Sequence, residues 1–140
     1  MAHFKKGFLD YLKSGQLSDV TLVTEHGQIR AHRVILAHSS DFFRLLLSSE
    51  FKEKRLAVVK LNFPDPSNVF PQVLQFIYQG KLIVTLESVI SLLTQADHYL
   101  IHKLASKCSE FVDKHLKRST VVKVAIISIY IISYIYIYIY

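Results

Sequence analysis

The apolar residues of the chain follow two spacings in turn, one typical of helices and one typical of strands. Helical spacing predicts helices over residues 4–14, 32–37, about 40–48, 69–79, about 85–96 and 104–116. Alternating or continuous apolar stretches predict strands over residues 20–24, 28–31 and 56–61. We therefore predict an α+β fold in which helices gather around a small sheet.

Turn and capping residues mark where several of these elements begin and end. Gly15 and Gly80 follow helical stretches and are expected to end them, because glycine readily adopts the left-handed backbone found there. Ser40 or Asp41 is expected to cap the third helix, and Thr85 the fifth. The inward face of the third helix is predicted to carry Phe42, Leu45 and Leu46.

The chain changes character near Thr120, which separates a domain over residues 4–118 from a tail over residues 119–140. The tail is almost wholly apolar and ends in alternating isoleucine and tyrosine. About 20 apolar residues suit a membrane anchor, although Lys123 and five tyrosines lie inside the tail. The alternation also suits a strand with two apolar faces, which would be prone to aggregation.

The genetic code offers a third interpretation of the tail, and we favour it. A repeated AT dinucleotide is translated as alternating isoleucine and tyrosine, so translation into AT-rich intronic or intergenic DNA would produce this ending. The hypothesis predicts a transcript whose coding frame diverges near Thr120. A cDNA that encodes the full tail would contradict it.

Composition indicates a folded intracellular domain. The hydrophobic fraction of 51% is too high for a disordered chain. One cysteine, Cys108, cannot form an intrachain disulfide, and Lys5, Lys6 and Asp10 interrupt any apolar leader. We expect the cytoplasm, the nucleus or both. The net charge of +6 comes from scattered residues, which argues against nucleic-acid binding.

Three ordered motifs resemble the BTB/POZ domain. Residues 31–43 contain an Ala-His-Arg start followed by Ser-x-x-Phe, and residues 76–82 and 96–99 match two later motifs of that family. The resemblance runs from about Phe4 to Leu116. It implies the BTB/POZ fold, with a small mixed sheet and surrounding helices, and a protein-binding module rather than an enzyme.

The resemblance also implies a dimer, formed with a second copy or with another BTB protein. In many BTB domains the first helix builds a symmetric interface, and the matching residues here are Phe4, Phe8 and Leu12. The matching acid–base pair near the dimer pocket is Asp19 and Arg33, expected as a buried pair; a partly exposed surface pair is the alternative. His32 is expected to be a structural histidine.

A second implication concerns a cullin-3 type scaffold. BTB adaptors of cullin-RING ubiquitin ligases carry an apolar-x-Glu motif after the third helix, and Phe51-Lys52-Glu53 matches it. Tyr99 matches a cullin-contacting tyrosine of the MATH-BTB adaptors. The alternatives are a solvated loop whose phenylalanine folds back on the domain, and a tyrosine at the edge of the core with a solvated hydroxyl.

Metal and catalytic chemistry find little support. His98 and His102 lie four residues apart, but the zinc-protease pattern His-Glu-x-x-His is absent. Cys108 fits a core position better than a metal site. No glycine-rich phosphate loop or nucleophile motif occurs. We therefore expect no cofactor, no metal and no enzymatic activity.

These observations leave three functional hypotheses. The first is a dimeric BTB module that acts as, or as part of, a substrate adaptor of a cullin-3 type ligase. Without kelch repeats or a MATH domain it would be a fragment of a longer adaptor, a subunit paired with a full-length one, or a competitor. The second is the BTB dimer of a transcriptional regulator that binds a corepressor peptide. The third, a membrane-tethered module, depends on the tail being genuine protein.

Overall fold

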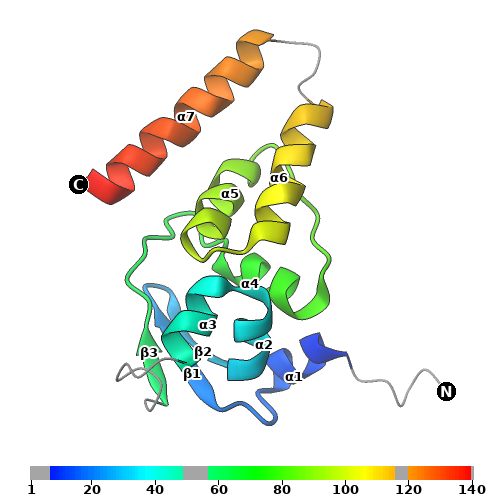
Figure 1. Ribbon diagram of the computed structural model, residues 1–140, viewed down its shortest axis with the longest axis vertical. Coiled ribbons are helices and arrows are strands. Elements are labelled where there is room, and N and C mark those ends of the chain that lie inside the picture. The colour runs from blue at the N-terminus through cyan, green and yellow to red at the C-terminus, as the bar shows by residue number, and fades with distance from the viewer. Residues whose placement is uncertain (1–6, 49–56, 116–119, 140) are drawn as a thin grey trace, which may run out of the picture.

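Helices and a small sheet make up the described parts of the computed structural model, which are residues 7–48, 57–115 and 120–139 (Figure 1). The elements in chain order are α1 (Phe8–Ser14), β1 (Val20–Thr24), β2 (Gly27–Ala31), α2 (Arg33–Ser39), α3 (Asp41–Ser48), β3 (Val58–Lys60), α4 (Phe70–Gln79), α5 (Val89–His98), α6 (His102–His115) and α7 (Thr120–Ile139). Within the domain this order follows the sequence-based prediction closely.

The sheet is mixed and has the strand order β2-β1-β3. β1 and β2 form an antiparallel hairpin in which Val20 pairs with Ala31 and Thr24 with Gly27. β3 runs parallel to β1, with Leu22 opposite Val59. The predicted α+β class with a small mixed sheet is therefore confirmed.

The core is built from the sheet and from helices α2 to α6. Figure 1 shows the sheet beside the α2–α3 pair, α4 in the middle and the α5–α6 pair beyond it. α1 packs against α4, and α2 contacts both α3 and α4. The most deeply buried side chains include Leu22, Leu36, Phe43, Val73, Leu74, Val89, Leu92, Tyr99, Leu104 and Cys108.

Helix ends follow the predicted signals. Gly15 and Gly80 both adopt the left-handed backbone, with φ of 72° and 74°, and donate to the carbonyls of Tyr11 and Phe76. This geometry ends α1 and α4 at the residues where the sequence places their stops. Before α5, Thr85 and Ser88 exchange hydrogen bonds between side chain and backbone, the reciprocal arrangement of a capping box.

The predicted inward face of α3 is partly wrong. Phe43 and Leu47 are the buried residues of this helix, whereas Leu45 is 56% exposed. Phe42 and Leu46 are half-buried at the edge of the core. The Ser40 hydroxyl accepts the backbone N–H of Phe43 at 3.1 Å, and this cap sets the phase that turns Phe43 and Leu47 inward.

The tail forms a helix, so the strand interpretation is wrong. α7 spans Thr120–Ile139 and packs against α5. A helix satisfies its backbone hydrogen bonds within the segment, whereas a lone strand would leave them unpaired. Within the described ranges, no helix is both long enough and apolar enough to span a membrane.

Candidate functional site

A groove between α3, β3 and the end of α5 is the main candidate site. It encloses about 660 Å³. Its walls are formed mostly by apolar and aromatic side chains, which come from three separate parts of the chain. The lining residues are Phe42, Leu46, Val58, Val59, Lys60, Leu61, Asn62, Phe63, His98 and Tyr99.

Ser40 connects two of the walls. Its hydroxyl caps α3 and also donates a hydrogen bond of 2.5 Å to the carbonyl of Tyr99, at the end of α5. The Ser40 side chain is buried, so both partners are shielded from water. The serine of the Ser-x-x-Phe motif therefore links the start of α3 to the end of α5 through hydrogen bonds.

Tyr99 forms the floor of the groove and stacks on the fully buried Phe43. The Tyr99 ring lies parallel to that of Phe43, with centroids 5.4 Å apart and planes 5° apart. Phe42 and Phe70 contact Tyr99 at 5.2 and 5.3 Å between centroids. Tyr99 is only 2% exposed, and burial raises the pKa of its hydroxyl well above the ordinary value.

The turn between α5 and α6 directs Tyr99 inward. Leu100 adopts a left-handed backbone with φ of 51°. The N–H of Ile101 bonds to the carbonyl of Ala96, and that of Leu100 bonds to Asp97. This is a Schellman motif with leucine where glycine is common. It ends α5 sharply and holds Tyr99 against the core.

His98 and Phe63 form the opposite wall. Their rings stack with centroids 3.7 Å apart and planes 6° apart. Burial lowers the pKa of His98 from its ordinary value, because the protonated imidazole loses hydration there. His98 is therefore favoured in its neutral form, which suits a largely apolar surface.

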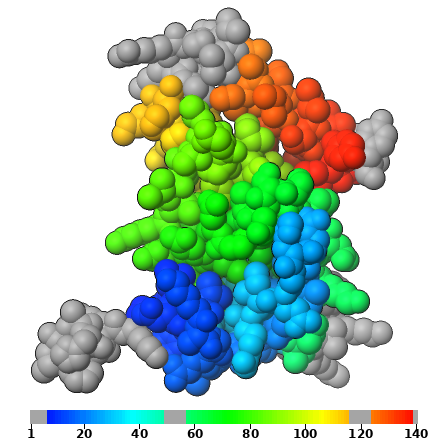
Figure 2. All heavy atoms as spheres, turned by 180° about the vertical axis from the view of Figure 1, so that it is seen from behind, coloured from blue at the N-terminus to red at the C-terminus, as the bar shows by residue number. Residues whose placement is uncertain are grey.

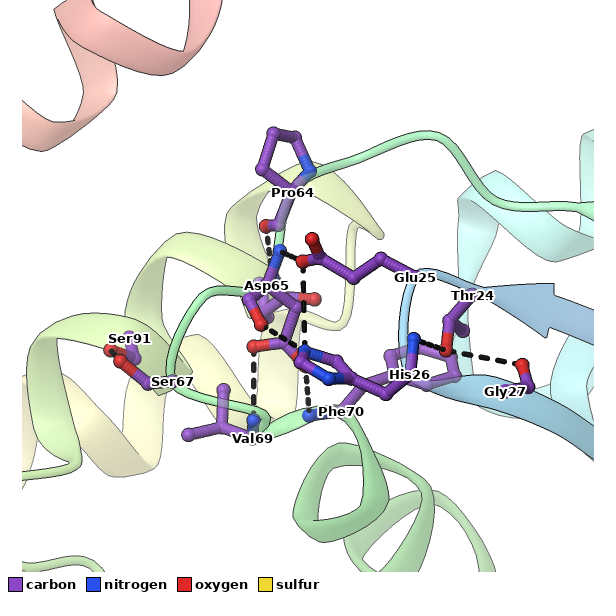
Figure 3. Close-up of polar contacts among 11 residues, drawn as sticks. Thr24, Glu25, His26, Gly27, Pro64, Asp65, Ser67, Val69, Phe70 and Ser91 are labelled. Carbon is purple, nitrogen blue, oxygen red and sulfur yellow. Dashed lines mark hydrogen bonds and ion pairs between the residues drawn. The ribbon is translucent and has the colours of Figure 1, made fainter.

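Asp65 fixes the segment that carries Phe63 (Figure 3). Its buried carboxylate accepts the backbone N–H groups of Val69 and Phe70, both at 2.9 Å, and so caps α4. Its own N–H donates to the Glu25 carboxylate, and its carbonyl accepts from His26 Nε2 at 2.6 Å. Asp65 thus connects residues 63–66 to the β1–β2 turn and to α4.

Of the three predicted cullin-contact residues, only Tyr99 belongs to the described part of the chain, and it lines the groove. Phe51 and Glu53 lie outside the described residues, in the segment that joins α3 to β3. Both flanking elements, α3 and β3, contribute lining residues to the groove. Tyr99 lines the groove and is only 2% exposed, so the alternative of a core-edge tyrosine with a solvated hydroxyl is wrong, while its contact with a cullin stays a prediction.

The expectation of a buried Asp19–Arg33 pair is also corrected. The Asp19 carboxylate accepts the backbone N–H of Arg33 at 2.8 Å, and the Arg33 Nε–H donates to the Asp19 carbonyl at 3.3 Å. These contacts are solvent-exposed. Because Arg33 is the first residue of α2, Asp19 caps this helix as well as lying beside the arginine.

His32 is held as a structural residue. Its Nε2 bonds to the carbonyl of Gln16 at 2.7 Å, and its Nδ1 and backbone N–H both contact the Tyr78 hydroxyl, at 2.8 and 2.9 Å. A hydrogen on Nε2 satisfies all three contacts, with Tyr78 donating to Nδ1 and accepting from the backbone. Burial raises the pKa of Tyr78 to about 12.

The first helix presents part of its apolar surface to solvent. Phe8 is 61% exposed, while Leu12 is partly buried against the core. Phe4 lies outside the described residues. Phe8 is therefore available for the predicted dimer interface, which stays a prediction.

The histidines weighed as zinc ligands have separate partners. His102 Nε2 bonds to the Asp41 carboxylate at 3.0 Å, and His98 bonds to the Tyr138 hydroxyl. The Cys108 thiol is buried in the core. Among the residues that the structure describes, no three His, Cys, Asp or Glu side chains gather in a way that could hold a metal ion.

Sequence reasoning missed most of the groove. Phe63 and His98 were not singled out as its walls, and Leu46 was expected to face inward rather than line a surface. One local signal was present in α3. This helix has more apolar residues than its buried face can hold, so Phe42 and Leu46 are left beside the buried Phe43.

Comparison with known proteins places these features in a family. Residues 8–116 match the BTB/POZ domain. Kelch-like protein 34 from Homo sapiens is 33% identical over 110 residues, which cover 79% of this chain and 17% of that protein. Zinc finger and BTB domain-containing protein 44 from Rattus norvegicus is 30% identical over 115 residues, covering 81% of this chain and 25% of the relative.

A solved structure agrees with the sequence matches. The BTB domain of zebrafish PATZ1 superposes with a TM-score of 0.66 at 26% identity, covering 76% of this chain and 86% of that one. The chain spans about a fifth of the length of its kelch-like relatives. From the matched motifs, the mixed sheet and the shared fold, we conclude that the chain belongs to the BTB/POZ domain family, whose domains are protein-interaction modules.

Proposed function

We propose that this BTB domain is a dimeric module that recruits a cullin-3 type scaffold through the groove between α3, β3 and α5, as part of a ubiquitin ligase adaptor. The observation that carries the proposal is the position of this groove. Leu46 of α3 and Val58, the first residue of β3, both line it, and these are the two elements that the chain connects through the Phe51-Lys52-Glu53 motif.

The chemistry of the groove suits an apolar helix of a partner. Phe42, Leu46 and Val58 supply an apolar wall, and Val58 is half-exposed although it belongs to a strand. Buried aromatic and aliphatic anchors supply most of the binding energy at such interfaces. We expect the glutamate of the apolar-x-Glu motif, Glu53, to interact favourably with the N-terminus of the incoming helix.

Dimerisation is part of the proposal. Phe8 on α1 and Val34 on α2 are large apolar side chains exposed on the single chain. A symmetric interface buries the same patch on both copies, which removes this apolar surface from water. Size measurement in solution checks this part, since a monomer at micromolar concentration would contradict it.

Titration calorimetry of the full chain against a cullin-3 N-terminal domain tests the groove. We expect Leu46→Ala and Phe51→Ala each to weaken binding at least about tenfold, near 1.4 kcal/mol. Leu45→Ala is the matched control, because Leu45 lies on the same helix but does not line the groove. Its affinity is expected to stay within about twofold of the parent.

Two outcomes would overturn the proposal. One is parental affinity in both Leu46→Ala and Phe51→Ala. The other is that neither the folded parent nor Tyr130→Ala/Tyr138→Ala, which frees the groove wall from α7, binds the cullin-3 N-terminal domain.

The corepressor-binding alternative has its own support. The zinc finger and BTB domain-containing relative and the PATZ1 structure belong to the matched proteins, and Asp19 and Arg33 lie at an exposed surface. This alternative places a peptide beside Arg33. It predicts that Arg33→Ala abolishes binding of a corepressor peptide while Leu46→Ala leaves it unchanged.

A further inference from the structure

The tail helix α7 lies alongside α5, next to the wall of the groove. Figure 1 shows α7 running beside α5, and from behind, in Figure 2, α7 lies on the α5 side of the molecule. Tyr130 donates a hydrogen bond of 2.9 Å from its hydroxyl to the Asp97 carboxylate. Tyr138 shares a hydrogen bond of 3.0 Å with His98 Nδ1.

These contacts come from one face of α7. Tyr130, Tyr134 and Tyr138 are spaced four residues apart, so they align along the helix. Neighbouring rings in this stripe lie 6.3 and 4.3 Å apart between centroids. Ile132 is 65% exposed and marks the opposite, solvent-facing side.

Tyr138 contacts two side chains of the groove wall, although it does not itself line the groove. Its ring lies 5.8 Å from Phe63 and 6.3 Å from His98, and both of these residues line the groove. Tyr138 therefore packs against the same two wall residues that a partner helix would contact. Burial of His98, which lowers its pKa, agrees with this packing.

We propose that α7 is an internal competitor for the groove, so that a partner helix binds only after Tyr138 leaves His98 and Phe63. This inference rests on the proposed function of the groove. It treats the tail as genuine protein that regulates the groove, in place of the read-through interpretation favoured from the sequence.

The contact is suited to reversible release. The Tyr138 and Tyr130 hydrogen bonds lie at exposed sites, where water replaces a lost bond at little net cost. Many other side chains of α7 are also exposed. A partner that fills the groove therefore has little to displace beyond one ring and two polar contacts.

Calorimetry on the full chain tests the competition, with the cullin-3 N-terminal domain as the probe. Tyr130→Ala/Tyr138→Ala removes both contacts and keeps α7 helical, because alanine favours helices. We expect this variant to bind at least roughly fivefold more tightly than the parent. Ile132→Ala is the matched control on the exposed face and is expected to bind like the parent.

A second readout reports on α7 docking without the probe. The ring C–H resonances of His98 in nuclear magnetic resonance spectra, assigned with His98→Gln, sense Tyr138 directly. We expect them to shift in Tyr130→Ala/Tyr138→Ala and to stay unchanged in Ile132→Ala. The pKa of His98 is expected to rise toward its ordinary value in the double variant, since Tyr138 no longer helps to bury it.

The outcomes separate the two proposals. Equal affinity of the parent and Tyr130→Ala/Tyr138→Ala would overturn the competition and leave the cullin proposal standing. Unchanged His98 resonances in the double variant would also overturn the competition. Absence of binding by both proteins would overturn the cullin proposal, and the competition with it.

Discussion

Replacing Tyr99 with alanine separates folding from binding at the groove. The ring is 2% exposed and stacks on Phe43, with edge contacts from Phe42 and Phe63 and a tilted contact from Phe70. Removing a buried ring of this size costs about 3–5 kcal/mol through lost burial and the cavity left behind. Small domains have a total stability of only about 5–15 kcal/mol, so Tyr99→Ala is expected to be severely destabilised.

Urea and thermal unfolding, followed by circular dichroism, measure this loss. For a domain between 100 and 150 residues, a change of 1 kcal/mol lowers the Tm by about 4 °C, so a loss of about 3–5 kcal/mol is expected to lower the Tm of Tyr99→Ala by about 12–20 °C. Tyr99→Phe is the matched control. It keeps every ring contact and is expected to lose less than about 1.5 kcal/mol.

The same pair of variants distinguishes the two roles of Tyr99. If the residue acts through the core, Tyr99→Phe binds the cullin-3 N-terminal domain like the parent, and Tyr99→Ala loses binding only as it unfolds. A Tyr99→Ala protein with near-parental stability and lost binding would refute this reasoning. That result would restore Tyr99 as a direct contact.

Two further predictions concern buried groups outside the groove. Asp65→Ala removes both side-chain hydrogen bonds at the N-terminus of α4 and is expected to lower the free energy of unfolding in urea by about 2–3 kcal/mol. Asp65→Asn keeps one oxygen and should lose less. Equal losses in the two variants would contradict the capping role. Burial raises the pKa of the Cys108 thiol to about 11, so iodoacetamide should react slowly at pH 8 until urea is added, and rapid native alkylation would contradict the burial. The thiol of the unfolded chain ionises at a lower pH than the buried thiol of the folded chain. The buried, neutral thiol therefore contributes fully to the free energy of unfolding below about pH 9, and this contribution is lost as the pH rises through about 11.

Local sequence determined the elements of the domain and its family. Apolar spacing was enough for the helices and strands, because the helical and strand periods reflect which side of each element is buried. Gly15 and Gly80 end their helices as predicted, since only the local backbone is involved. The Ser-x-x-Phe motif likewise marks the start of α3 through a contact between residues three apart.

Tertiary structure decided which apolar residues are core and which are surface. Tyr99 lies in the floor of the groove because Phe43 and Phe70, distant in sequence, pack on it. The groove itself joins residues 42–46, 58–63 and 98–99, which no local period connects. The tail shows the same limit, since alternating Ile and Tyr suits several structures. Its packing against α5, through Tyr130 and Tyr138, depends on Asp97 and His98, more than 30 residues away along the chain.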